Sequence, residues 1–270
     1  VKKAVIADTI GLEVDRLWRE PGAFSGVAVL LVVVLYAVQI YCDFSGYTDM
    51  ALGVAQMLGY RLPENFDRPY SSRSIDEFWR RWHMSLSSWL RDYLYIPLGG
   101  NRHGERTTYR NLMATMLIGG LWHGAGWTFV FWGGLHGAGL AFERWRAGRR
   151  ADRLERPSRR SAFLSWFITF HFVCFAWVFF RATSFENALA VLGRLFTAWG
   201  QPSPAITLGV LAAIAVGLGV QFLPAGAWPR VQARLSRWSF GWQGAVFGVA
   251  LMVINTLGPA GIAPFIYFRF

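Results

Sequence analysis

The chain alternates between long apolar segments and shorter basic ones. A helix needs about 20 mostly apolar residues to cross a membrane. Five uncharged or nearly uncharged segments approach or exceed that length, and residues 43–60 form a weaker sixth that contains Asp43 and Asp49. This pattern predicts an all-α, polytopic bundle of membrane helices. The five segments are residues 24–42, 111–142, 161–180, 205–223 and 240–257.

The segment 111–142 is too long for one perpendicular crossing. Its 32 residues would rise well beyond the ~30 Å apolar core of a bilayer at 1.5 Å per residue. Gly124 and Gly126 offer a break in the middle. Non-helical backbone at membrane depth is tolerated only where protein or a water-filled cavity surrounds it. We therefore expect a re-entrant pair of helices that lines an internal site.

Residues 61–100 are too polar to span a membrane. Ser74 to Glu77 form a capping box that predicts the start of a helix. Beyond it, apolar side chains recur at helical spacing, and Pro97 marks an end. We expect one continuous interfacial helix whose apolar face includes Trp79, His83, Leu86 and Leu90.

Composition supports a lipid environment. Hydrophobic residues make up 54% of the chain and charged residues only 16%, well below the ~25% of soluble domains. The net charge of +11 is concentrated in residues 61–110 and 144–160, as in cytoplasmic loops, so we expect no nucleic-acid partner. If residues 43–60 return through the membrane, these stretches lie on the side of Lys2 and Lys3. Cys42 and Cys174 lie in apolar runs without metal-type spacing.

Histidine is the residue that indicates chemistry. His123, His136 and His171 lie in uncharged segments, where an ionisable side chain is costly and marks a functional candidate. His123 stands between glycines, where substrate can approach, and a neutral imidazole there suits a general base. We expect His136 and His171 to be structural. A zinc site built from His83 and His123 lacks a third ligand, so we expect no bound metal.

Several sequence blocks resemble the membrane-bound O-acyltransferase family, in its bacterial branch that acetylates polysaccharides. The resemblance begins near Lys2 and continues, more weakly, through Trp177-Val178-Phe179-Phe180-Arg181 to the closing block Pro264-Phe265-Ile266-Tyr267-Phe268. The blocks are Tyr41-Cys42-Asp43-Phe44-Ser45-Gly46-Tyr47-Thr48-Asp49, Pro63-Glu64-Asn65-Phe66, Phe78-Trp79-Arg80-Arg81-Trp82-His83-Met84-Ser85, Arg91-Asp92-Tyr93-Leu94-Tyr95-Ile96-Pro97-Leu98-Gly99-Gly100 and Gly120-Leu121-Trp122-His123-Gly124.

The resemblance implies a tunnel through the bilayer and transfer of an acyl group from a cytoplasmic thioester to a hydroxyl. In that pattern His123 is catalytic and His83 lines the same tunnel. We expect the tunnel or substrate site to include Trp122, Trp82, Asp43, Asp49, Asn111 and Ser85.

The resemblance also implies the substrates and the location. Acetyl-CoA is the expected donor and an exopolysaccharide such as alginate the acceptor, reached directly or through a periplasmic acetyltransferase partner. The expected location is the bacterial inner membrane, with residues 1–270 forming one membrane domain that is the carboxyl-terminal part of a longer protein. No bound cofactor is expected.

Three points stay open from the residues, and one of them is whether the chain is a non-catalytic fragment that only scaffolds. A histidine could act as a general base, or it could carry the acetyl group as a nucleophile. The rival class is a transporter or channel in which the intramembrane histidines relay protons and Asp43 or Asp49 couples to the substrate.

Overall fold

The computed structural model describes residues 1–149, 158–201, 207–224 and 226–258. Within them all regular structure is helical, apart from one isolated bridge between Phe66 and Trp82, which confirms the all-α prediction. The elements are η1 Lys2–Ala7, α1 Asp8–Arg19, η2 Pro21–Ala23, α2 Gly26–Met57, η3 Pro69–Ser71, α3 Ile75–Arg81, α4 Met84–Leu90, η4 Arg91–Tyr95, α5 Gly104–His123, α6 Trp127–Gly148, α7 Arg159–Arg181, α8 Phe185–Arg194, α9 Leu208–Gly219, η5 Val220–Phe222, α10 Ala227–Leu235 and α11 Phe240–Leu257.

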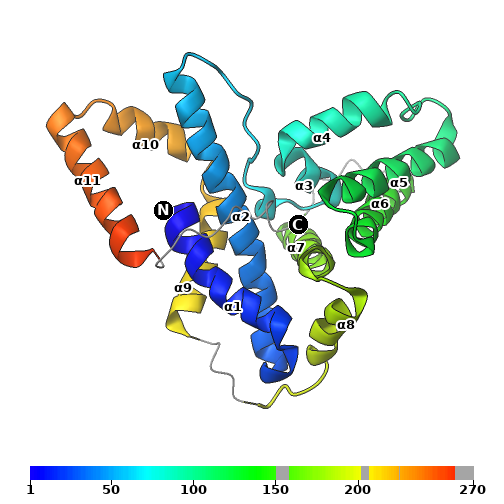
Figure 1. Ribbon diagram of the computed structural model, residues 1–270. Coiled ribbons are helices and arrows are strands. Elements are labelled where there is room, and N and C mark those ends of the chain that lie inside the picture. Colours follow the sequence, from blue (N-terminus) through cyan, green and yellow to red (C-terminus); the bar gives the residue numbers. More distant parts are fainter. Residues whose placement is uncertain (150–157, 202–206, 225, 259–270) are drawn as a thin grey trace.

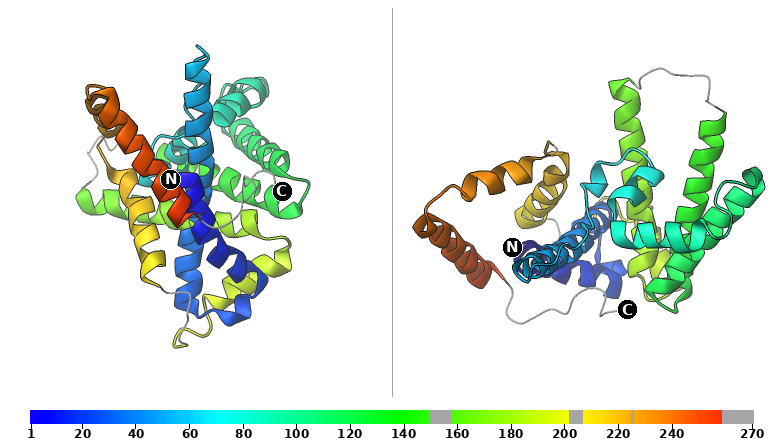
Figure 2. Two further views of the ribbon diagram at one scale, coloured as in Figure 1. Left: turned by 60° about the vertical axis from the view of Figure 1, so that its left-hand side comes forward. Right: turned by 90° about the horizontal axis from the view of Figure 1, so that it is seen from above.

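Helix α2 is the central element, with α9 to α11 on one side of it and α3 to α6 on the other (Figure 1). The Ser25 side chain caps its start by accepting a hydrogen bond from the Ala28 amide. Against α2 pack α1, which buries Val14, Leu17 and Trp18, and also α7 and α9. The two further views show α1 lying along α2 and α11 standing apart from the central packing (Figure 2).

Residues 43–60, the weaker candidate for a sixth span, form no separate returning helix. They continue α2, which runs unbroken for 32 residues and so extends about 48 Å. After α2 ends at Met57, the chain turns at Gly59, whose φ of +84° favours glycine. The two carboxylates that weakened this segment are paired with η1: Asp43 lies 3.0 Å from the Lys3 amine and Asp49 2.5 Å from the Lys2 amine. The placement of the basic stretches with Lys2 and Lys3 depended on that return and loses its basis.

Residues 111–142 break where the glycines predict. Helix α5 ends at His123, α6 begins at Trp127, and the two form an antiparallel hairpin (Figure 1). The hairpin is closed by glycine: a Cβ at Gly120 would clash with the Phe129 carbonyl, and one at Gly133 with that of Met116. The backbones of the two helices therefore touch, and no passage runs between them at this level.

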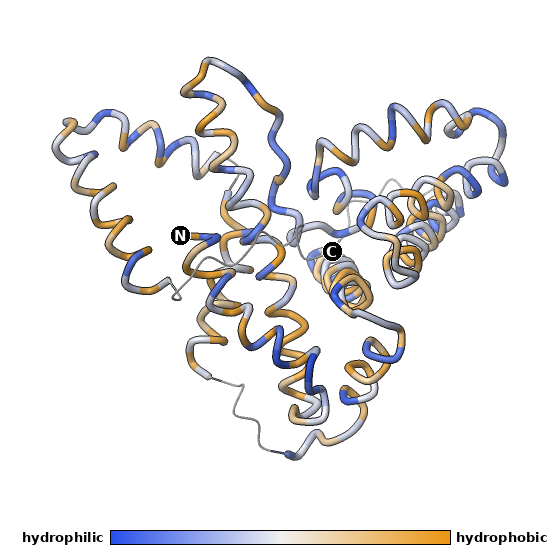
Figure 3. Tube along the Cα trace, in the orientation of Figure 1, coloured by the Kyte–Doolittle hydropathy of each residue, from blue (hydrophilic) through white to orange (hydrophobic). Residues whose placement is uncertain are grey.

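Three described helices are long and apolar enough to cross a membrane: α2, α7 and α11. They contain most of the predicted segment 24–42 and all of 161–180 and 240–257, and hydrophobic residues predominate along them in Figure 3. The segment 205–223 begins outside the described residues. Its described part, α9 with η5, qualifies only together with α10, across a bend of 95°. The basic stretch 143–160 lies partly, and the closing block 264–268 wholly, outside the described residues.

Candidate active site

His123 is the last residue of α5, at the break of the hairpin. Its Nδ1 atom lies 2.7 Å from the carbonyl oxygen of Gly119. A carbonyl only accepts, so Nδ1 carries the proton and Nε2 is the basic nitrogen. The side chain is 9% exposed, and its ring contacts those of Trp132 and Phe180 with centroids 5.1 and 5.2 Å apart. The protein thus fixes both the tautomer and the orientation that a general base requires.

His83 lies at a break that the sequence pattern does not predict. The expected continuous interfacial helix is wrong: α3 ends at Arg81, α4 begins at Met84, and His83 between them has left-handed backbone with φ 44°. The cause is the segment before α3, because Asp67 donates its backbone N–H to the Arg81 carbonyl and Met84 donates to that of Asn65. The capping box itself is confirmed, since the Ser74 hydroxyl accepts from the Glu77 amide.

Asn65 is the site residue that sequence reasoning missed. Its Oδ1 atom accepts from the backbone N–H of Ser85 at 3.2 Å and from the Ser85 hydroxyl at 2.6 Å, and it lies 3.3 Å from His83 Nδ1. Because Oδ1 already serves as an acceptor, the third contact assigns the proton to His83 Nδ1. Asn65 thereby orients His83 as Gly119 orients His123. The sequence signal that could have identified Asn65 is its place in the block from Pro63 to Phe66.

The two histidines share one neighbour, Trp122. The ring of Trp122 lies 6.2 Å from that of His83 and 5.0 Å from that of His123, measured between centroids. Trp122 is 56% exposed, and Trp127 just beyond the break is 76% exposed, so the paired histidines lie beside an open edge of the molecule. Burial, with a smaller contribution from the nearby His123, lowers the pKa of His83 to about 3. His83 is therefore neutral near pH 7.

The other predicted site residues divide into two groups. Trp122 and Ser85 contact the histidine pair, and Trp82 is buried between Phe78 and Trp177, directly before His83. Asn111 is buried elsewhere: its amide donates to the carbonyls of Leu98 and Gly100, which fixes the turn before α5. Asp43 and Asp49 pair with lysines of η1, as described above.

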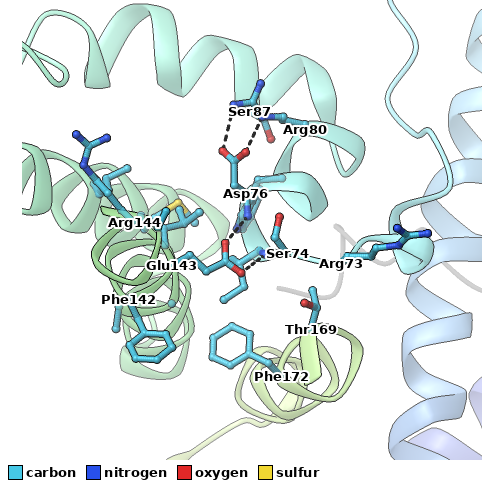
Figure 4. Close-up of a pocket in the computed structure, with 18 of the residues that line it drawn as sticks. Arg73, Ser74, Asp76, Arg80, Ser87, Phe142, Glu143, Arg144, Thr169 and Phe172 are labelled. Carbon is cyan, nitrogen blue, oxygen red and sulfur yellow. Dashed lines mark hydrogen bonds and ion pairs between the residues drawn. The ribbon is translucent and has the colours of Figure 1, made fainter. Parts of the chain in front are cut away.

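A cavity of about 1480 Å³ lies between α3, α4, α6 and α7 (Figure 4). Its floor is apolar and its lining includes five arginines, from Arg73 to Arg146, against two acids. Both acids are engaged: Asp76 pairs with Arg80, and the Glu143 carboxylate accepts from the amides of Ile75 and Asp76. Arg80, Arg91 and Arg144 are also paired with acids, so Arg73 and Arg146 carry the excess positive charge above the apolar floor.

The cavity does not reach His123. Trp79 lines it and contacts Trp132, with centroids 5.7 Å apart, and Trp132 contacts the His123 ring. Trp79 and Trp132 therefore lie between the basic cavity and His123. Among the described residues, no group of three histidines, cysteines or acids could hold a metal ion.

Comparison with known proteins assigns the family. Residues 5–185 match the model of the membrane-bound O-acyltransferase family. The chain belongs to the membrane-bound O-acyltransferase family. This match includes both histidines, Asn65 and the whole cavity lining, so the features described above lie in the family's own region.

The relatives that the chain matches are named for acyl transfer to alginate, peptidoglycan or teichoic acid. The chain is 49% identical over 197 residues to the "Probable alginate O-acetylase AlgI" of Pseudomonas putida, which covers 73% of the chain and 39% of that protein. It is 47% identical over 192 residues to the peptidoglycan O-acetyltransferase of Helicobacter pylori, with 71% and 36% covered. Identity to the teichoic acid D-alanyltransferase of Bacillus subtilis is 35% over 170 residues. The chain spans less than two fifths of the length of the first two relatives.

Proposed function

We propose that the protein transfers an acetyl group from acetyl-CoA to hydroxyl groups of a cell-surface polysaccharide, with His123 as the general base. The observation that carries this proposal is the position of His123 at the break after α5, beside His83 and Trp122, with Gly119 holding Nδ1–H so that Nε2 is the basic atom. The names of the relatives support the reaction class, since two of those cited above are O-acetylating enzymes.

The reaction needs one base and one leaving thiolate. His123 Nε2 takes the hydroxyl proton as the hydroxyl oxygen attacks the thioester carbonyl carbon. The tetrahedral intermediate then collapses, the carbon–sulfur bond breaks, and the imidazolium returns the proton to the thiolate. A positioned base contributes roughly 10²- to 10⁴-fold to such a step. His83, whose Nδ1–H is directed to Asn65, has an accepting Nε2 that would orient the hydroxyl.

The donor has a suitable site in the arginine-lined cavity. Phosphate groups favour arginine, which binds them with paired N–H donors. Arg73 and Arg146 form no ion pair within 4 Å among the described residues, and the apolar floor can receive the pantetheine arm. In this assignment the cavity faces the cytoplasm.

The acceptor would approach from the other side, along the open edge beside Trp122 and Trp127. An exopolysaccharide such as alginate is the acceptor we favour, because the first relatives named are alginate O-acetylases. Transfer to the polysaccharide directly or through a periplasmic acetyltransferase partner, and residence in the bacterial inner membrane as a multi-pass protein, complete the proposal.

Thiol release tests the proposal against a transporter. Membranes that contain the intact protein are supplied with acetyl-CoA and deacetylated alginate, and free thiol is measured with a chromogenic disulfide. We expect acceptor-dependent thiol release and acetate esters in the polymer. A pH-dependent flux of protons or acetate without consumption of acetyl-CoA would instead identify a transporter and overturn the proposal.

A further inference from the structure

His136 is a fully buried histidine outside the catalytic pair. It lies on α6, is 0% exposed, and is enclosed by Phe78, Trp79, Trp132 and Phe172. Its Nδ1 atom accepts a hydrogen bond from the Trp79 indole N–H at 3.2 Å. Neutral imidazole carries one proton, so Nε2 is the protonated nitrogen, and it has no partner among the described residues. Burying a polar ring in such an apolar shell costs free energy unless the ring is hydrogen bonded.

The partner of His136 occupies the boundary between the cavity and His123. Trp79 lines the cavity on one side and contacts Trp132, the neighbour of His123, on the other. The alternative route, between α5 and α6, is closed by the backbone contacts at Gly120 and Gly133. The Trp79 indole, together with Trp132, therefore lies on the direct route from the cavity to His123.

We propose that His136 is a positioning residue that latches the Trp79 indole across the passage from the cavity to His123. This inference rests on the proposed function, in which the donor occupies the cavity. One neutral hydrogen bond suits a latch, because it holds the indole in a single orientation yet breaks at modest cost when the acyl group enters. The closed indole limits passage to small acyl groups.

Accessibility of position 123 tests the latch without turnover. His123→Cys is introduced into the intact protein with Cys42→Ala and Cys174→Ala, and sealed vesicles of each orientation receive a membrane-impermeant methanethiosulfonate. His136→Phe keeps a ring but removes the acceptor. We expect it to raise the labelling rate from the cavity side by roughly five- to ten-fold, the equivalent of one net hydrogen bond. Labelling from the opposite side should not change.

Three further variants separate a latch from a structural effect. Trp166→Phe removes another indole donor, which binds the Tyr70 carbonyl away from the passage, and should leave labelling unchanged. His136→Gln restores an acceptor and should restore slow labelling. In a Trp79→Phe background, which lacks the indole donor, His136→Phe should add nothing. Equal rates for His136→Phe and the parent, or an equal rise from both sides, would overturn the inference.

Acyl-chain selection provides the second readout. With acetyl-CoA and octanoyl-CoA as competing donors, His136→Phe should raise the share of octanoyl transfer by roughly five- to ten-fold. An unchanged ratio in an active enzyme would refute the latch alone. No transfer by the wild-type protein would refute the proposed function, and the labelling result would then decide the latch by itself.

Discussion

The imidazole of His123 is hydrogen bonded to the carbonyl of Gly119, one turn earlier in the same helix, with 2.7 Å between Nδ1 and the oxygen. His171 makes the same contact to Phe167 at 2.8 Å on α7. The hydrogen bond alone therefore does not distinguish a catalytic histidine. What distinguishes His123 is its place: it ends a helix at a glycine break, beside the second histidine and beneath an exposed tryptophan.

Asn65→Ala should impair catalysis through His83. The substitution removes the acceptor shared by the Ser85 amide, the Ser85 hydroxyl and His83 Nδ1. Leaving buried donors unpaired costs about 1–3 kcal/mol, and a misoriented imidazole should lower kcat by about ten-fold or more. The measurements are acetyl transfer and the thermal midpoint in detergent.

Asn65→Asp is the matched control, because an aspartate at this position keeps the accepting oxygen. It should retain the left-handed backbone at His83 and more activity than Asn65→Ala. Equal activity of Asn65→Ala and wild type would show that Asn65 does not position His83.

The pKa of His83 predicts how stability changes with pH. Its folded value of about 3 lies below the ~6.5 of the unfolded chain. At a pH between these two pKa values, the unfolded state binds a proton at His83 and the folded state does not. The free energy of unfolding is therefore fully retained above pH ~6.5 and falls below it, by up to ~1.4 kcal/mol per pH unit for this group.

His83→Gln isolates this contribution, since glutamine does not titrate. Chemical unfolding at pH 7 and pH 5 should show a smaller loss of stability for His83→Gln than for the wild type. Parallel losses in the two proteins would contradict the buried, neutral state of His83.

Alanine at the hairpin glycines should destabilise the protein. Gly120→Ala and Gly133→Ala each place a Cβ against a carbonyl of the facing helix, so α5 and α6 must separate. Such overpacking costs about 1–3 kcal/mol and would also displace His123. Gly134→Ala is the control, because its Cβ would meet only the Leu117 side chain at 3.5 Å, an ordinary contact. Equal thermal midpoints for the three variants would contradict the close backbone contact between α5 and α6.

The sequence predicted those parts of the fold that local chemistry dictates. The apolar runs of α2, α7 and α11, the capping box at Ser74 and the break at Gly124 and Gly126 all follow from spacing and residue type. Residues 43–60 were the weaker candidate for a span because they contain two carboxylates, and the sequence does not show that they continue α2. Asp43 and Asp49 are accommodated by Lys3 and Lys2, and such pairing across elements is not visible in a local window.

The candidate site was predictable in its residue types and not in its geometry. The histidines stood out because ionisable groups are costly in apolar segments. The break at His83 was hidden, since Trp79, His83, Leu86 and Leu90 fit a helical period perfectly well. It is imposed by hydrogen bonds from the loop before α3, whose path depends on tertiary packing.

The most direct test of the central claim compares His123→Ala with His171→Ala in the intact protein. Both histidines make the same hydrogen bond within their helices, so the pair controls for loss of an intrahelical contact. Acetate esters in the acceptor polysaccharide are measured at equal amounts of folded protein in the membrane. We predict that His123→Ala lowers acetylation by roughly 10²-fold or more, whereas His171→Ala leaves it near the wild-type level. Wild-type acetylation by His123→Ala would contradict the assignment of His123 as the base.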